Sequence, residues 1–338
     1  MIETELGNLR RSHYSDEINS SMDGTEVIIM GWVLTIRGHG NISFATIRDK
    51  NGDISVVAKK GDCPDEIREK ISSLKAHSSI AVTGKVKSSE KAPSGFEIIP
   101  TELRVFSEVE KTPPFEPTAK TVKNIDTRLE VRPIDLRRKP LQHIFNARSL
   151  VLKSIRDYFY SQKFTEINTP KMIATATEGG AALFAIFYYN KEAFLAQSPQ
   201  LYKEQLTMSF EKVFEIAPIF RAESSRTNRH LAEAISIDLE EAFVDYNDVM
   251  DRIEELIKIS IKTVNDYVTN NPDAEFIIPI MPETIPRYSY DELIDKMQKA
   301  EVKTEWGDDL YPSNLKKINL DGFYFITDWP LGQKPFYV

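Results

Sequence analysis

The fold of this chain is decided by the stretch Val213-Phe214-Glu215-Ile216-Ala217-Pro218-Ile219-Phe220 and its partner Ala234-Ile235-Ser236-Ile237-Asp238-Leu239-Glu240-Glu241-Ala242-Phe243. Both segments are rich in β-branched and aromatic residues, and the residues between them are polar, which predicts two strands joined by a loop. Strand side chains alternate between faces. We therefore expect Ile235, Ile237 and Leu239 to face a core, with Ser236, Asp238 and Glu240 on the opposite face.

Charged residues continue this hairpin on both sides of its loop. The first strand runs into Phe220-Arg221-Ala222-Glu223, and the second is preceded by Arg229-His230-Leu231-Ala232-Glu233. A guanidinium is the side chain best shaped to clamp a phosphate. The alternative is a surface hairpin with solvated charges, which is commoner for a lone charged hairpin. The order of the charges against the strand alternation favours a site for a nucleotide and an amino acid.

Length and composition limit the class of protein. The chain has 338 residues, enough for two domains, and a formal net charge of -8, so no global basic field draws it to nucleic acid. Its single cysteine, Cys63, excludes an intramolecular disulfide and fits a reducing compartment. The N-terminus lacks the pattern of a signal peptide, and no apolar run is long enough to cross a membrane. These features predict a cytoplasmic protein.

Short strands separated by turns dominate the N-terminal third. They are expected at 26–35, 42–48, 53–59, 80–87 and 96–106, with a helix at 65–74. Five strands with a helix after the third are typical of an OB barrel, which often binds single-stranded nucleic acid. Stacking and phosphate-binding groups lie on the first two strands, namely Trp32, Arg37, His39, Phe44 and Arg48. The alternative that Trp32 and Phe44 are barrel core stays open here.

A proline-containing segment, 111–123, predicts a linker. A basic cluster follows it and comprises Arg128, Arg132, Arg137, Arg138 and Lys139. Phosphate contact and structural ion pairing are equally good explanations of this cluster. Beyond it, helical spacing of apolar residues predicts helices over 141–163 and 247–268, and Phe164 to Pro170 reads as a strand stopped by proline. Mixed helices and antiparallel strands without a βαβ rhythm favour the α+β class.

Three motifs occur in order along this part of the chain: Thr177-Glu178-Gly179-Gly180, Ala196-Gln197-Ser198-Pro199-Gln200-Leu201-Tyr202-Lys203 and Phe220-Arg221-Ala222-Glu223. With these motifs behind an OB barrel, nearly the whole chain resembles the class II aminoacyl-tRNA synthetases of the aspartate, asparagine and lysine group. It is most similar to the aspartyl branch of the archaeal and eukaryotic kind. The resemblance implies an N-terminal extension at 1–20, an OB-fold anticodon-binding domain at 21–107, a linker or hinge at 108–140 and a class II catalytic domain with an antiparallel sheet at 141–338.

The resemblance also implies roles at the hairpin, which corresponds to motif 2 of the family. Arg221 would hold the α-phosphate of ATP, Glu223 the adenine amino group or the tRNA acceptor end, and His230 the distal phosphates. Arg229 and Leu231 would belong to the same ATP-binding loop. Positioning and charge neutralisation are sufficient for this chemistry, so these residues, rather than a nucleophile, are the expected catalytic groups.

The amino-acid pocket is implied in the same way. Glu178 and Gln200 would bind the amino group of L-aspartate, Lys203 its side-chain carboxylate, and Asp238 would position them. Ser198-Pro199 reads as an N-cap with proline at the first helical position, which places Gln200 and Lys203 on one helix face.

The implied reaction uses ATP and Mg²⁺ to convert L-aspartate to aspartyl-adenylate, and then transfers aspartate to tRNA(Asp). The helix beginning near Leu141 and the strand ending at Pro170 would form motif 1, which implies a homodimer. In the barrel, the anticodon residues would be Trp32, Arg37, Phe44, Ser55 and Pro93. Ser55 stands where a glutamine is common, and Pro93 resembles members that charge both tRNA(Asp) and tRNA(Asn), so the choice between the two tRNAs stays open.

The chain also departs from the family pattern. No glycine-rich motif 3 and no family metal-binding carboxylates are found, so we expect no metal ligands in this chain. We expect a fragment or truncated product that forms adenylate poorly by itself. Ala234 replaces a phenylalanine that often lies under adenine. One alternative is an asparaginyl-tRNA synthetase or relative. Lys203 argues against it, because a lysine suits a side-chain carboxylate better than an amide. The other alternative is a non-catalytic tRNA- or RNA-binding paralogue.

Overall fold

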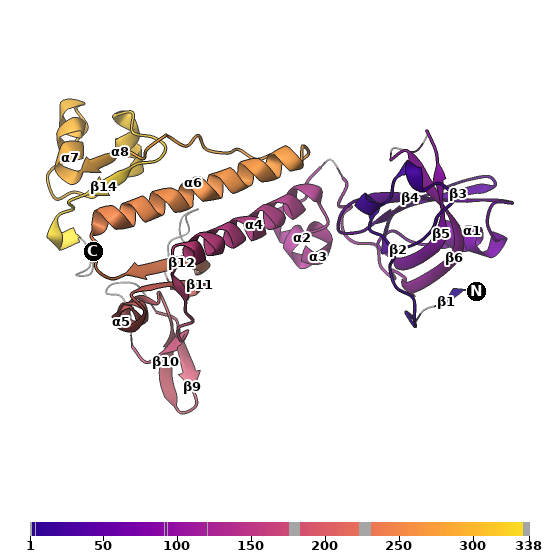
Figure 1. The fold of residues 1–338 in the computed structure, drawn as a ribbon, viewed down its shortest axis with the longest axis horizontal. Helices are drawn as coiled ribbons and strands as arrows, with labels where there is room; N and C mark the ends of the chain where they lie inside the picture. The colour runs from indigo at the N-terminus through magenta and orange to yellow at the C-terminus, as the bar shows by residue number, and fades with distance from the viewer. Residues whose placement is uncertain are drawn as a thin grey trace. The chain divides into compact units, whose positions relative to one another are not determined.

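The computed structural model describes residues 2–3, 5–90, 92, 94–119, 121–175, 183–222 and 231–333. The chain divides into two compact units, Met1–Asp135 and Leu136–Val338 (Figure 1). Five residues with predicted roles lie outside the described residues, namely Pro93, Glu178, Glu223, Arg229 and His230.

The first unit is a closed barrel of the OB type, in which β4 and β6 pair parallel and the other neighbouring barrel strands pair antiparallel. Its strands are β2 (Glu26–His39), β3 (Ile42–Arg48), β4 (Asp53–Lys59), β5 (Ser79–Ser88) and β6 (Phe96–Ser107), with α1 (Asp65–Ser73) between β4 and β5. The strands pair in the order β6-β4-β3-β2-β5, and β5 pairs again with β6, which closes the barrel. A two-residue strand, β1 (Ile2–Glu3), adds to β6. The expected barrel is confirmed.

One strand is longer than the sequence pattern predicts. The hydrophobic alternation ends near Thr35, but β2 continues to pair with β3 as far as His39, opposite Ile42, and the register shifts between Val33 and Thr35. A bulge of this kind reverses the faces of the following side chains and hides the remainder of a strand from pattern reading. Gly31 is required nearby, since a Cβ there would lie 2.4 Å from the carbonyl oxygen of Arg48.

Aliphatic side chains from all five barrel strands fill the interior, and Ile67 and Ile71 of α1 cover one end. Cys63 lies just before α1 and packs partly buried against this core. Burial raises the pKa of its thiol above the usual value, although the nearby Arg68 acts in the opposite direction.

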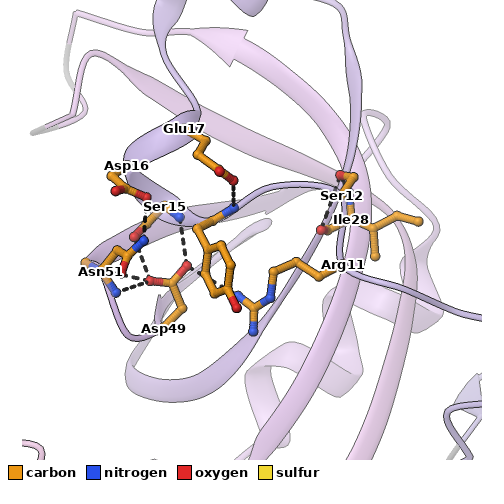
Figure 2. Close-up of polar contacts among 10 residues, drawn as sticks. Arg11, Ser12, Ser15, Asp16, Glu17, Ile28, Asp49 and Asn51 are labelled. Atoms are coloured by element: carbon orange, nitrogen blue, oxygen red, sulfur yellow. Dashed lines mark hydrogen bonds and ion pairs between the residues drawn. The ribbon is translucent and has the colours of Figure 1, made fainter. Parts of the chain in front are cut away.

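Residues 11–17 pack onto the turn between β3 and β4, where Asp49 is buried. Figure 2 shows Ser15, Asn51 and Arg11 converging on its carboxylate. Asp49 accepts hydrogen bonds from the Ser15 amide and hydroxyl, both at 2.7 Å, and from the Asn51 amide at 2.8 Å, and it pairs with Arg11 at 3.4 Å. A buried carboxylate needs such donors. The N-terminal segment is therefore held to the barrel by Asp49, by the Ile28 amide donating to the Ser12 hydroxyl at 2.7 Å and by the Asn51 side chain donating to Asp16 at 2.7 Å.

Two short helices end the first unit, α2 (Ile125–Glu130) and α3 (Arg132–Asp135). The Asp135 carboxylate is fully buried and pairs with Arg128 at 2.9 Å and with Arg132. The hydrogen bond from Arg128 holds the pKa of Asp135 below its usual range. For these two arginines of the basic cluster, structural ion pairing is therefore the correct explanation, because the buried acid engages both side chains.

The second unit begins with α4 (Lys139–Ser161) and β7 (Thr165–Glu166), followed by β8 (Met172–Ile173), β9 (Ala185–Tyr188), β10 (Lys191–Leu195) and α5 (Gln200–Phe210). β11 (Lys212–Phe220) and β12 (Glu233–Glu241) then pair antiparallel, with Ile216 opposite Ile237, as predicted. The strand order β12-β11-β7 is completed by a parallel pairing of β7 with β11. The long helix α6 (Tyr246–Asn270) lies beside α4 (Figure 1).

The core between α4 and the sheet lies at one end of the hairpin. Phe159, Phe164 and Phe214 form its centre, with Leu239 packed against them. Leu239 is opposite Phe214 and therefore belongs to this core as expected. Ile235 and Ile237 are 46% and 39% exposed, so their predicted place in the core is wrong. Ile235 lies near the other end of β12 and Ile237 at its middle, and neither belongs to the aromatic cluster.

A separate small module follows α6. It contains β13 (Arg287–Ser289), α7 (Tyr290–Lys299), α8 (Pro312–Lys317), β14 (Phe325–Thr327) and η3 (Leu331–Gln333). Its core includes Tyr290, Leu293 and Met297. None of these elements is among those predicted from the sequence, although Ser289 and Glu292 form a capping box at the start of α7. That spacing ahead of an apolar periodicity is a recognisable helix start.

Candidate active site and nucleic-acid interface

Backbone hydrogen bonds bring three distant segments of the second unit together. The Ala196 amide donates to the Lys171 carbonyl at 3.0 Å, and the Phe220 amide donates to the Ala196 carbonyl at 3.0 Å. The Arg221 amide donates to Ala232 at 3.0 Å, across the base of the hairpin loop. The segment before α5 is therefore fixed beside the end of β11, where Arg221 emerges.

A buried carboxylate reinforces this junction. Glu215 of β11 accepts hydrogen bonds from the Thr169 amide at 2.7 Å, the Thr169 hydroxyl at 2.9 Å and the Lys171 ammonium at 2.8 Å. Because each donor comes from the segment after β7, Glu215 holds that segment against the sheet. Sequence reasoning missed this role, since a single glutamate in an apolar strand gives no partner.

The start of α5 differs by one residue from the prediction. Pro199 is the N-cap and Gln200 is the first helical residue. The Ser198 hydroxyl accepts a hydrogen bond from the Gln200 amide at 3.3 Å, so the serine still binds the helix start. The Gln200 side chain donates to Glu204 at 2.7 Å, one turn along the helix.

Lys203 projects from α5 towards β12 and is only 9% exposed. Its ammonium donates to the Leu239 carbonyl at 3.2 Å and lies 3.6 Å from Asp238 Oδ1 and 3.4 Å from Glu240 Oε2. The structure therefore brings Lys203 and Asp238 together. It also adds Glu240, which the strand alternation had placed on the same face without a role.

The nucleotide part of the predicted site is only partly described. Arg221 is half-buried directly beyond β11, and Leu231 is exposed where the chain returns towards β12. Ala234 pairs with Ile219 on the hairpin. The remaining predicted ATP contacts lie outside the described residues.

A second ionic cluster anchors the far end of the hairpin. Glu241 has a buried carboxylate that pairs with Arg252 of α6 at 3.1 Å and with Lys212. Burial acts to raise the pKa of Glu241, but the hydrogen bonds from Arg252 and Lys212 outweigh it and hold the pKa below its usual value. The same carboxylate raises the pKa of Arg252. The hairpin is thus tied to α6.

On the barrel, Trp32 and Phe44 are 42% and 41% exposed. Their assignment to the barrel core is therefore excluded. Arg37 lies opposite Phe44 in the β2–β3 pair. Ser55 lies opposite Thr46, two residues from Phe44 along β3. The four predicted anticodon residues that the structure describes thus occupy β2, β3 and β4.

Arg48 does not fit the phosphate-binding role suggested by its sequence position. Its guanidinium makes a bidentate pair with Asp53, with distances of 2.6 and 2.7 Å, and the residue is buried. A turn of only four residues separates the two strands that carry these side chains, which explains why the arginine finds an acid there. The Arg48 guanidinium therefore joins the end of β3 to the start of β4 through Asp53.

Membrane-spanning helices and metal-binding clusters are both absent from the described residues. None of the described helices is long and apolar enough to cross a membrane. In the same part of the chain, no group of three or more histidine, cysteine, aspartate or glutamate residues is arranged to hold a metal ion.

Comparison with known proteins identifies the class. Residues 124–338 match the family model described as tRNA synthetases class II (D, K and N), and residues 27–106 match the OB-fold nucleic acid binding domain. The chain belongs to the class II tRNA synthetases of this group, an enzyme family that joins an amino acid to tRNA with the use of ATP.

Individual relatives show which members of this group the chain is similar to. The chain is 48% identical over 334 residues to the aspartate--tRNA(Asp/Asn) ligase of Methanocaldococcus jannaschii, with 97% of this chain and 76% of the relative covered. It is 44% identical to the enzyme of the same description from Methanococcus aeolicus, with 98% and 77% covered. Among solved structures, the asparaginyl-tRNA synthetase of Pyrococcus horikoshii complexed with asparaginyl-adenylate matches with a TM-score of 0.86 at 32% identity, covering 97% of this chain and 76% of that one.

Proposed function

We propose that this protein is an aspartate–tRNA ligase that activates L-aspartate with ATP and transfers it to tRNA(Asp). The observation that carries the proposal is the buried Lys203 ammonium facing β12, because a fixed cation suits a side-chain carboxylate better than an amide. The similarity to aspartate--tRNA(Asp/Asn) ligases at up to 48% identity supports the same substrate. Gln200 and Glu178 would bind the amino group of the substrate, and Asp238 would hold Lys203 in position.

In the first step, an oxygen of the aspartate α-carboxylate attacks the α-phosphorus of ATP. An O–P bond forms, the bond to the β-phosphate oxygen breaks, and pyrophosphate leaves with the electron pair. Arg221 would neutralise charge at the α-phosphate, with His230 and Arg229 at the distal phosphates and Glu223 at adenine. No proton transfer to a protein group is required, so positioning and charge neutralisation supply the rate enhancement.

Mg²⁺ would accompany ATP in this family, where it neutralises charge on the phosphates. The described residues contain no cluster suited to hold a metal ion, so we assign it no ligand and no step in this chain.

The second step transfers aspartate from the adenylate to the terminal ribose of tRNA, releasing AMP. We propose that the barrel, within 21–107, binds the anticodon through Trp32, Arg37, Phe44, Ser55 and Pro93. The exposed rings of Trp32 and Phe44 support this role, because unpaired bases stack on such rings. The descriptions of the relatives extend the proposal to tRNA(Asn).

We also propose that two copies associate through motif 1, formed by α4 and β7. The apolar side chains that α4 leaves exposed support such a surface, namely Ile144, Phe145, Leu150 and Tyr160. Light scattering is expected to give twice the chain mass at micromolar concentration. A monomer at every concentration tested would contradict this part of the proposal.

The second candidate is an asparaginyl-tRNA synthetase, which the structural match at a TM-score of 0.86 favours. Pyrophosphate exchange by the intact full-length protein, measured with aspartate, asparagine and lysine in turn, separates the two. We expect aspartate to give an exchange rate at least tenfold above the others. Exchange that depends on asparagine instead would overturn the assignment of aspartate.

A further inference from the structure

The Lys203 ammonium is shared between two acidic side chains of one strand. Asp238 and Glu240 lie on the same face of β12 because strand side chains alternate. Their carboxylate oxygens are 3.6 and 3.4 Å from Nζ, and the Leu239 carbonyl between them accepts a hydrogen bond at 3.2 Å. One cation therefore faces two anions, which leaves the cluster with an excess negative charge.

Neither carboxylate makes the closest contact available to an ammonium. Charge-assisted N–H···O bonds commonly measure about 2.7–2.9 Å. Both contacts here are longer, and the neutral carbonyl is the nearest of the three oxygens. A ligand carboxylate can thus approach Nζ more closely than either acid, but it must do so against their combined charge.

The two acids differ in their access to solvent. The Glu240 side chain is 30% exposed and that of Asp238 is 18% exposed. Glu240 also has one more methylene, so its carboxylate can move without displacing the strand. Asp238 is the more buried partner of the lysine, and Glu240 is the more exposed one.

We propose that Glu240 weakens the preference of this pocket for a charged over a neutral amino-acid side chain, by competing with the ligand carboxylate for the Lys203 ammonium. The inference rests on the proposed function, in which Lys203 binds the side chain of aspartate. In this arrangement Glu240 limits the affinity for aspartate and has little effect on a neutral amide of the same shape. It is a positioning residue that acts through Lys203.

The test is the variant Glu240→Gln, which keeps the shape and removes the charge. Binding of L-aspartate and of L-asparagine to the full chain is measured by titration calorimetry. We expect aspartate to bind about threefold to tenfold more tightly, as for loss of one partly screened charge, with asparagine changed less than about twofold. The ratio of the two affinities is the informative quantity, because a general structural change would move both.

Glu233→Gln is the matched control, since Glu233 is an exposed acid on the same strand and its loss changes the net charge equally. Its affinity ratio should equal that of the wild type. If Glu240→Gln does not fold, Glu240→Asp withdraws the carboxylate and should raise the ratio by a smaller factor.

An unchanged or lower ratio in the folded variant overturns the inference while leaving the proposed function intact, provided that the wild type binds aspartate. Failure of the wild type to bind aspartate overturns both the proposed function and the inference.

Discussion

Replacement of Glu215 by glutamine should destabilise the second unit, because this carboxylate joins the segment after β7 to β11. Glu215 is buried and accepts three hydrogen bonds from Thr169 and Lys171, at 2.7 to 2.9 Å. Glutamine keeps one acceptor oxygen but directs an amide NH₂ group towards donors, and it leaves the Lys171 ammonium without its counter-ion at this position.

The loss of unfolding free energy in Glu215→Gln can be bounded from these contacts. A hydrogen bond to a charged group contributes roughly 1.5–3 kcal/mol, and breaking a fully buried ion pair costs about 3–5 kcal/mol. The Lys171 side chain is 23% exposed and regains some hydration, which reduces the upper figure. We therefore expect the free energy of unfolding to fall by about 2–3 kcal/mol, which lowers the urea midpoint by roughly 1 M.

The assay can be confined to the second unit. The chain has three tryptophans, of which Trp306 and Trp329 lie in this unit and Trp32 lies on the barrel surface. In a Trp32→Phe background, tryptophan fluorescence during urea unfolding reports on the second unit alone. This separation matters because two units need not unfold in one transition.

Two controls accompany the measurement. Glu192→Gln changes an exposed acid of the same unit and should alter stability by less than about 0.5 kcal/mol. Lys171→Met, combined with Glu215→Gln, should give a coupling energy of at least about 1 kcal/mol. A loss below about 1 kcal/mol for Glu215→Gln, or additive double-variant energies, would refute the assigned role.

Three further predictions concern the remaining ionic and aromatic groups. Asp135→Asn should lower the stability of the first unit by about 2–4 kcal/mol in urea unfolding, because it leaves the paired Arg128 next to a neutral buried amide; an unchanged midpoint would contradict this. The pKa of Glu241 is lower in the folded state, so its contribution is present above its usual value of 4.5 and is lost as the pH falls through the folded value. The stability difference between wild type and Glu241→Gln should thus shrink below pH 4.5, and a constant difference would show that Arg252 does not stabilise the charged form. Phe44→Ala should weaken tRNA binding about tenfold at fixed salt in a filter-binding assay, since one base loses a stacking ring; an equal affinity would argue against this face of the barrel.

The barrel was the most predictable part of the molecule. The bounds of β3 and β4 follow from alternation that stops at a turn rich in polar residues and glycine, so local pattern and tertiary structure agree. The extension of β2 to His39 could not be predicted, because a bulge after Val33 interrupts the alternation. The antiparallel hairpin of the second unit was predictable for the same reason as the barrel strands.

The partners of individual side chains were the least predictable features. Arg48 suggests a phosphate ligand because the sequence shows its charge but not its pairing with the Asp53 carboxylate. Ile235 and Ile237 obey the alternation, yet the part of the chain that the structure describes leaves both side chains exposed. The resemblance puts Lys203 and Asp238 in one pocket, and their charged atoms lie 3.6 Å apart, whereas the contact of Glu240 with Lys203 is visible only in the structure.

The solitary thiol of Cys63 offers a practical route to following events at the barrel. A maleimide fluorophore can attach at only one position in the whole chain, and that position lies in the OB-fold unit just before α1. Because burial raises the thiol pKa, the reactive thiolate is scarce at neutral pH, and coupling should need mildly alkaline buffer and longer incubation. A dye placed there would give an optical signal for RNA docking on the barrel without any engineered cysteine.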